Sequence, residues 1–194
     1  MIQPVTQDVR SRVNQEENSV DESSLLRAAC HNPAAFARLY DRYVHALYKY
    51  LLSKTGNVAE AEDLTSQTFL SALENLPAYR DQGNFRAWLF TIARNKWVDF
   101  CRKNSRLFSL DNKSPAAMQI DFLQEVIQGE KSQVLSDLVR KLRKNEVDLL
   151  RLRLVSELEF GEIAVVLGKS ESAVKKTYYR LIERMKKDME QIYG

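Results

Sequence analysis

The sequence has 194 residues, of which 44% are hydrophobic and 28% charged, a composition typical of an ordinary soluble protein with one large or two small domains. Its net charge of +3 is uninformative as a total, because the charges are segregated along the chain. No apolar run approaches the roughly 20 residues of a membrane-spanning helix and the N-terminus lacks the apolar core of a signal peptide, so we expect no membrane insertion and a cytoplasmic location. Only six glycines, four prolines and few runs rich in Val, Ile or Thr predict an all-α fold.

Residues 1–22 are polar and have no hydrophobic period, which predicts a flexible tail. Asn32-Pro33 is typical of a helix start, and apolar residues then recur at helical spacing. Gly56-Asn57 ends this first helix and precedes an acidic helix over 58–76.

Beyond a break from Pro77 to Asn84, the pattern predicts a third long helix that ends at about Lys103. Residues 23–105 are expected to form the first of two small helical domains. A flexible linker over 106–132 then precedes a second domain over 133–194, because polar residues and Pro are mixed there with scattered apolar ones.

The acidic helix has a polar stripe at three- and four-residue steps that includes one leucine: Glu60, Asp63, Gln67, Leu70 and Glu74. The opposite arc is apolar and includes Ala61, Leu64 and Leu73. A solvated helix face would explain the stripe, and so would a docking surface for a basic helical partner with Leu70 as its apolar anchor. The residues alone do not decide between the two.

Basic residues gather in two other places, Arg94–Arg106 and Lys169–Lys187. Two separate basic surfaces indicate two contacts with a polyanion. The loop before the first of them contains Tyr79, whose ring could stack on an extruded base, although it could equally hold the loop against the core. Phe85 and Trp88 are expected in the core, whereas Arg94 and Asn95 are better candidates for contact with nucleic acid.

The segment 160–184 has the spacing of a helix-turn-helix. Gly168 supplies the positive φ that the turn needs, and Ser170 can cap the second helix. At about 100° per residue, one arc of that helix is apolar and includes Val174 and Tyr178. The other arc carries the candidate DNA-contacting residues Ser172, Lys175, Lys176, Tyr179 and Arg180.

No catalytic chemistry is indicated, and we expect neither an enzyme nor a cofactor. Cys30 and Cys101 are isolated, so neither a zinc site nor a disulfide is expected. The two histidines lack the spacing of HExxH, and no Gly-rich phosphate loop is present in the sequence.

Three segments carry a specific pattern: EAEDLTSQTFLSAL at 60–73, YRDQGNFRAWLFTIARNKWVDFCRK at 79–103 and ELEFGEIAVVLGKSESAVKKTYYRL at 157–181. Together they resemble bacterial RNA polymerase sigma factors of the extracytoplasmic-function (ECF) subfamily. The resemblance covers most of the chain and implies a promoter-specific initiation factor whose two domains correspond to sigma regions 2 and 4. Where the family usually has Gln-Glu, this chain has Ser66-Gln67.

The resemblance implies that the acidic stripe docks on the polymerase core, of which β′ and β are the expected partners. It implies a contact with the melted −10 strand from residues in and after the loop, namely Tyr79, Arg80, Asn84, Arg94, Asn95, Lys96 and Arg102. The helix-turn-helix residues named above would contact the −35 duplex. No motif decides whether an anti-sigma factor restrains the chain.

The alternative function is a stand-alone helix-turn-helix regulator that binds duplex DNA without joining polymerase. It would explain the second domain but not the acidic stripe or the aromatic loop. Such regulators usually dimerise so that two recognition helices reach adjacent major grooves, whereas we expect this chain to be a monomer when free.

Overall fold

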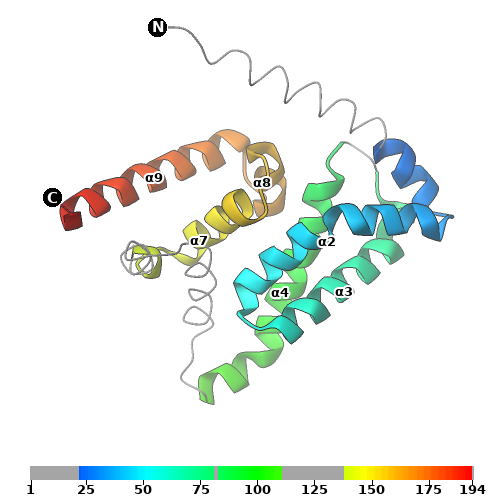
Figure 1. The fold of residues 1–194 in the computed structure, drawn as a ribbon, viewed down its shortest axis with the longest axis horizontal. Helices are drawn as coiled ribbons and strands as arrows, with labels where there is room; N and C mark the ends of the chain where they lie inside the picture. Colours follow the sequence, from blue (N-terminus) through cyan, green and yellow to red (C-terminus); the bar gives the residue numbers. More distant parts are fainter. Residues whose placement is uncertain (1–21, 81–82, 111–137, 194) are drawn as a thin grey trace, which may run out of the picture.

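The structure is a computed structural model of the full chain, and it describes residues 22–80, 83–110 and 138–193. Throughout these ranges every regular element is a helix (Figure 1). The expected tail lies outside the described residues except for Glu22. That residue begins a short helix over 22–29, and its carboxylate accepts a hydrogen bond from the hydroxyl of Tyr43.

The first two long helices begin and end where local signals place them. In α2 (Pro33–Thr55), the Asn32 side chain accepts a bond from the Ala34 N–H at 2.9 Å, and Gly56 ends the helix with a φ of +64°. Helix α3 (Val58–Asn75) is capped by Asn57 and continues into a 3-10 turn, η1 (Leu76–Ala78).

Helix α4 (Phe85–Leu110) is longer than the sequence pattern predicts. Its predicted end at Lys103 was wrong because no Gly or Pro follows there to stop it. The first five positions of the expected linker, 106–110, are therefore helical, and its remainder lies outside the described residues.

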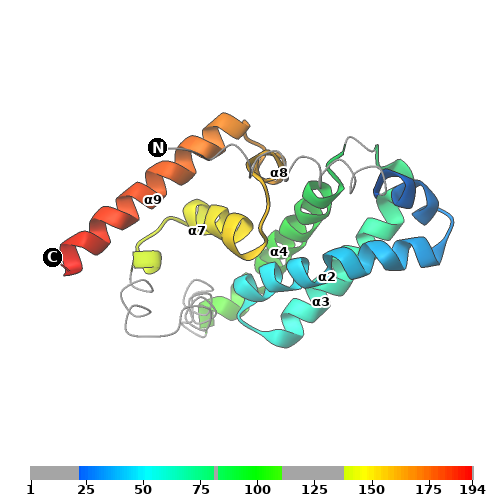
Figure 2. The ribbon, with the colours of Figure 1, turned by 45° about the horizontal axis from the view of Figure 1, so that its top comes forward.

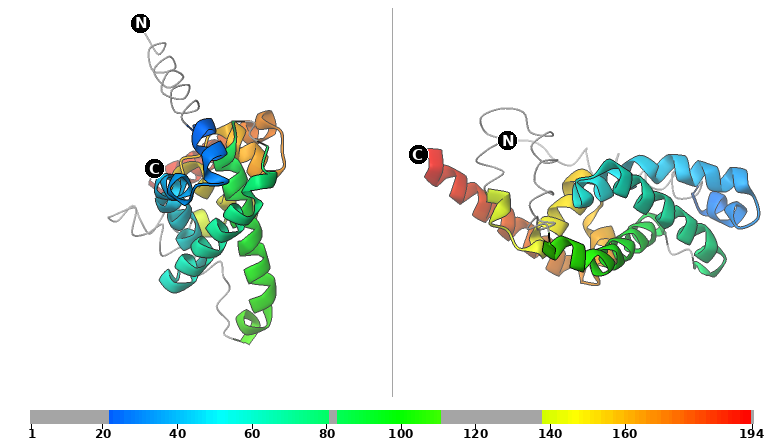
Figure 3. Two further views of the ribbon diagram at one scale, coloured as in Figure 1. Left: turned by 90° about the vertical axis from the view of Figure 1, so that its right-hand side faces the viewer. Right: turned by 90° about the horizontal axis from the view of Figure 1, so that it is seen from below.

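The second unit consists of α7 (Lys144–Leu150), a π-helical turn η2 (Arg151–Val155), α8 (Phe160–Leu167) and α9 (Glu171–Tyr193). Figure 2 shows α8 and α9 meeting at one end, with α7 below α9. Helix α9 and the α2–α4 bundle extend to opposite ends of the molecule (Figure 3).

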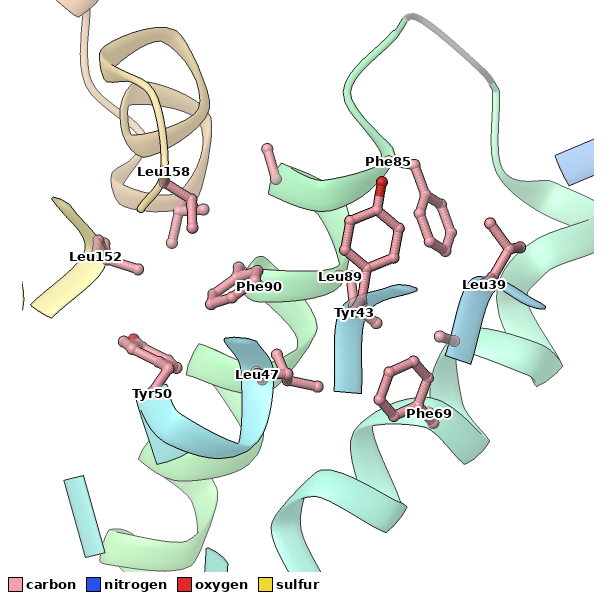
Figure 4. Packing of buried hydrophobic residues seen from close by; sticks show 14 of the residues in the cluster. Leu39, Tyr43, Leu47, Tyr50, Phe69, Phe85, Leu89, Phe90, Leu152 and Leu158 are labelled. Atoms are coloured by element: carbon pink, nitrogen blue, oxygen red, sulfur yellow. The ribbon is translucent and has the colours of Figure 1, made fainter. Parts of the chain in front are cut away.

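The two units share one continuous hydrophobic cluster rather than two separate cores. Helix α8 packs against α4, and η2 packs against α2. In Figure 4, Leu152 and Leu158 of the second unit face Tyr50 and Phe90 of the first, and all four are fully buried. This packing joins the two helical units face to face, which their separate sequence patterns do not indicate.

Candidate functional site

The acidic stripe of α3 lies on the outer surface of the α2–α4 bundle. The opposite side of α3 is buried and includes Ala61, Leu64, Phe69 and Ala72. This packing leaves Asp63, Gln67, Leu70 and Glu74 exposed, while Glu60 is half-buried and burial raises its pKa. The four exposed members and the neighbouring Leu73 form a continuous face, which from here on is called the α3 face.

Leucine side chains make the α3 face more apolar than its charges suggest. Leu70 is 58% exposed, and Leu73 is 43% exposed. The expectation that Leu73 lies on the buried arc was wrong, because a step of three residues places it only about 60° around the helix from Leu70. The face therefore presents two adjacent leucines.

Side chains on this face are partly organised by local hydrogen bonds. Gln67 donates from Nε2 to Asp63 Oδ2 at 2.7 Å, which holds the two polar groups together. The hydroxyl of Ser66 donates to the Glu62 carbonyl oxygen at 2.9 Å. At this position the chain thus directs a small polar group back to its own backbone.

The loop before α4 is anchored by aromatic rings. Tyr79 is half-buried and lies 4.7 Å from Trp88 and 5.7 Å from Phe85, measured between ring centroids. Phe85 is buried, as expected. Arg80 and Asn84 are exposed on either side of positions 81–82, which lie outside the described residues. Tyr79 therefore has intramolecular ring partners on the side that faces the core.

The candidates on α4 lie on different faces of the helix. Asn95 and Arg102 are exposed and share one face, since a step of seven residues is almost two turns. Arg94 and Lys96 are half-buried and point about 100° to either side of Asn95. Arg102 forms an exposed ion pair with Asp99 at 3.3 Å. Only part of this set can contact one ligand at the same time.

The helix-turn-helix has the geometry that its sequence predicts. Gly168 ends α8 with a φ of +62°, and the Lys169 N–H donates to the Ala164 carbonyl oxygen at 2.9 Å. The Ser170 hydroxyl accepts a bond from the Ala173 N–H at 3.3 Å, which caps α9. These two local features orient α9 with respect to α8.

The outward arc of α9 carries all five predicted DNA-contacting residues, which are exposed: Ser172, Lys175, Lys176, Tyr179 and Arg180. Lys175 pairs with Glu171 at 2.7 Å, and this contact raises the pKa of Lys175. Lys176 and Arg180 form no ion pair within the described part of the chain. These two side chains are therefore the cations on this arc most available to an anionic ligand.

Tyr178→Ala is expected to lower the free energy of unfolding by about 2 kcal/mol, and Tyr179→Ala by less than about 0.5 kcal/mol. Tyr178 is half-buried with its ring 5.3 Å from that of Phe160, whereas Tyr179 is 61% exposed. Thermal and urea denaturation of both variants would measure the difference. A larger loss for Tyr179→Ala would mean that the outward arc of α9 has been assigned wrongly.

The described residues, 22–80, 83–110 and 138–193, also bear on two other kinds of site. Among those residues no group of three or more His, Cys, Asp or Glu side chains could hold a metal ion. No described helix has the length and hydropathy needed to cross a membrane.

Comparison with known proteins identifies one family. The family Sigma-70 region 2 matches residues 39–107. The ECF RNA polymerase sigma factor BldN of Streptomyces coelicolor is 37% identical over 82% of this chain, which spans 62% of the length of BldN. The RNA polymerase sigma factor YlaC of Bacillus subtilis is 32% identical over 78% of this chain and 90% of YlaC.

Solved structures show the same fold. CnrH, in complex with the cytosolic domain of CnrY, gives a TM-score of 0.62 at 24% identity, over 86% of this chain and 96% of CnrH. The sigma factor RpoE of Bartonella quintana, in complex with the anti-sigma factor NepR, gives a TM-score of 0.59 at 20% identity, over 80% of this chain and 96% of RpoE.

Proposed function

Since the chain belongs to the ECF subfamily of bacterial RNA polymerase sigma factors, we propose that it binds core polymerase and directs initiation at specific promoters. The α3 face would dock on the core, α4 and its preceding loop would contact the melted −10 strand, and α9 would contact the −35 duplex. Transcription initiation with this chain would take place in the cytoplasm, and the chain itself would catalyse no reaction.

The observation that carries the proposal is the exposed pair of leucines within an acidic surface on α3. A helix face used only for solubility would gain nothing from exposing Leu70 and Leu73 next to each other. A partner helix with apolar and basic residues would bury the leucines and pair with Asp63 and Glu74. Gel filtration of the chain with purified core polymerase tests this step, and we expect a stable complex.

The outward face of α4 supports contact with single-stranded DNA. Asn95 is exposed and can hydrogen-bond to the edge of an unpaired base, while Arg102 on the same face can approach a phosphate. Tyr79 is half-buried at the start of the preceding loop, and we include it as a candidate for stacking on an extruded base.

Asn95→Ala is expected to reduce promoter opening about 5- to 150-fold, the loss of about 1–3 kcal/mol associated with one base contact. Closed-complex formation should be nearly unchanged, because the base becomes accessible only after melting. Permanganate reactivity of thymines in the bubble measures opening. A premelted template should restore most of the activity, and a normal bubble with the variant would exclude this role for Asn95.

The outward arc of α9 supports contact with duplex DNA. An α-helix fits the major groove, and Lys176 and Arg180 are placed one turn apart on the exposed side. Ser172 near the helix start can hydrogen-bond to a phosphate or a base edge.

We also propose an anti-sigma factor as a second partner. The support is the fold shared with the Bartonella quintana sigma factor, which was solved with the anti-sigma factor NepR. Purification of the tagged chain from its own host, in the presence and absence of excess core, would show whether a protein other than polymerase subunits binds it. Recovery of polymerase alone would contradict this partner.

A further inference from the structure

A buried cluster of charges lies where the two helical units meet. The carboxylate of Asp148 in α7 contacts three side chains of the first unit. Lys54 Nζ lies 2.5 Å from Asp148 Oδ1, and Arg94 Nε lies 3.3 Å from Oδ2. The Tyr50 hydroxyl donates to Oδ1 at 3.3 Å. Lys54 and Asp148 are only 5% and 8% exposed, so this contact excludes solvent.

Positive charge exceeds negative charge in the cluster. Lys54 and Arg94 from the first unit, and Arg151 from η2, surround the single carboxylate of Asp148. Burial lowers the pKa of Lys54 and of Arg151. Burial alone would raise the pKa of Asp148, but the charges of Lys54 and Arg94 outweigh it and lower that pKa, so the carboxylate stays ionised.

The same interface covers one side of α4. Arg86, Phe90 and Arg94 follow at four-residue steps and form a stripe beneath the second unit. Arg86 donates to the carbonyl oxygens of Ser156 and Glu157, and Phe90 packs among Leu152 and Leu158 (Figure 4). The stripe adjoins the outward face of α4 that carries Asn95.

The packing of the second unit on α4 is called the closed arrangement from here on. A chain in this arrangement cannot contact both promoter elements at the same time. The −35 and −10 elements are named for their positions relative to the transcription start, so they lie about 25 base pairs apart. At about 3.4 Å per base pair, this separation is roughly 85 Å along the DNA. In the structure α8, which immediately precedes α9, lies directly against α4. The second unit must therefore leave α4 when both elements are bound, and Lys54 and Arg94 then lose their partner.

We propose that Lys54 and Arg94 form a binding site for a DNA backbone phosphate, and that Asp148 occupies this site while the free chain is closed. A carboxylate and a phosphate present the same chemistry to these cations, two oxygens that share negative charge. Asp148 thus acts as an internal substitute for DNA and restrains the free chain from binding single strands. This inference rests on the proposed contact of α4 with promoter DNA.

Asp148→Asn in the full chain tests the proposal. Without the carboxylate, the buried cations repel one another and gain hydration only if the units separate. Small-angle scattering should show a larger radius of gyration than for the unaltered chain. Fluorescence anisotropy should show at least fivefold tighter binding of labelled oligothymidine, a probe that suffices because a phosphate site requires no base sequence.

Two controls separate this role from a general loss of charge. Glu146→Gln alters the same helix, but Glu146 pairs with Arg184 at 3.0 Å inside the second unit, so size and binding should not change. Adding Lys54→Gln to Asp148→Asn should reverse the gain in affinity. It should also make the salt dependence of log affinity shallower by about 0.7, the value for one phosphate contact on single-stranded DNA.

Two results would overturn the proposal: an Asp148→Asn chain that stays compact, or one that expands without binding oligothymidine more tightly. If this variant does not fold, Arg86→Ala provides the same test, since it opens the other end of the interface and leaves the cluster residues intact. Core binding through α3 is measured in parallel. A chain that binds core but shows no gain in oligothymidine binding contradicts this inference alone, whereas failure to bind core contradicts the proposed function.

Discussion

Leu70→Arg is expected to remove most of the binding of this chain to core polymerase. The substitution deletes an apolar anchor that is 58% exposed in the free chain and places a cation against a basic partner. Loss of an interface anchor costs about 2–4 kcal/mol, which corresponds to roughly 30- to 700-fold in affinity. Biolayer interferometry with immobilised core polymerase would measure this loss of affinity. Asp63→Arg should act in the same direction with a smaller effect.

Leu154→Arg is the matched control for this prediction. Leu154 is 57% exposed, almost the same as Leu70, but it lies in η2 of the second unit, away from the α3 face. The same chemical change there should leave core affinity unaltered. If both variants bind normally and retain wild-type circular dichroism, the α3 face is a solvated surface and another part of the chain docks on core.

Alanine at both Lys176 and Arg180 is expected to weaken binding to −35 duplex DNA by at least about 30-fold. Each cation contributes about 1–3 kcal/mol if it reaches a base edge, and binding should then lose sequence preference as well. Folding should be unaffected, since both side chains are exposed and the helix core at Val174 and Leu181 is untouched. Anisotropy with specific and scrambled duplexes measures both effects.

Lys187→Ala serves as a control on the same helix. Lys187 lies three turns beyond Lys176, where it pairs loosely with Glu183 at 3.9 Å. The Lys187→Ala substitution should change the affinity for −35 duplex DNA only slightly. An equal loss on specific and scrambled duplexes from the Lys176 and Arg180 variants would show that these residues contact phosphates only, and sequence recognition would then have to come from other residues of α9.

Features that depend on neighbours in sequence could be predicted from the residues alone. The cap at Asn32, the positive φ of Gly168 and the cap at Ser170 each follow from the chemistry of one or two side chains. The separation of Tyr178 from Tyr179 follows from helix periodicity. These local rules also explain why all five candidates on α9 are exposed on one arc.

Features that depend on distant residues could not be predicted in this way. Tyr50 and Asp148 are 98 positions apart, and no spacing rule links a lysine in the last turn of α2 to an aspartate in α7. Arg94 was expected to face nucleic acid, and its ion pair with Asp148 appears only when the two units are packed together.

The most direct test of this function is transcription by purified core polymerase from a library of promoter sequences, with and without this chain. We predict transcripts that depend on the chain and start at a fixed distance downstream of two shared sequence elements, one at −35 and one at −10. Leu70→Arg should remove these transcripts, and Leu154→Arg should retain them. Transcripts that are equally abundant without the chain, or that start at sites with no shared elements, would contradict its function as a promoter-specific initiation factor.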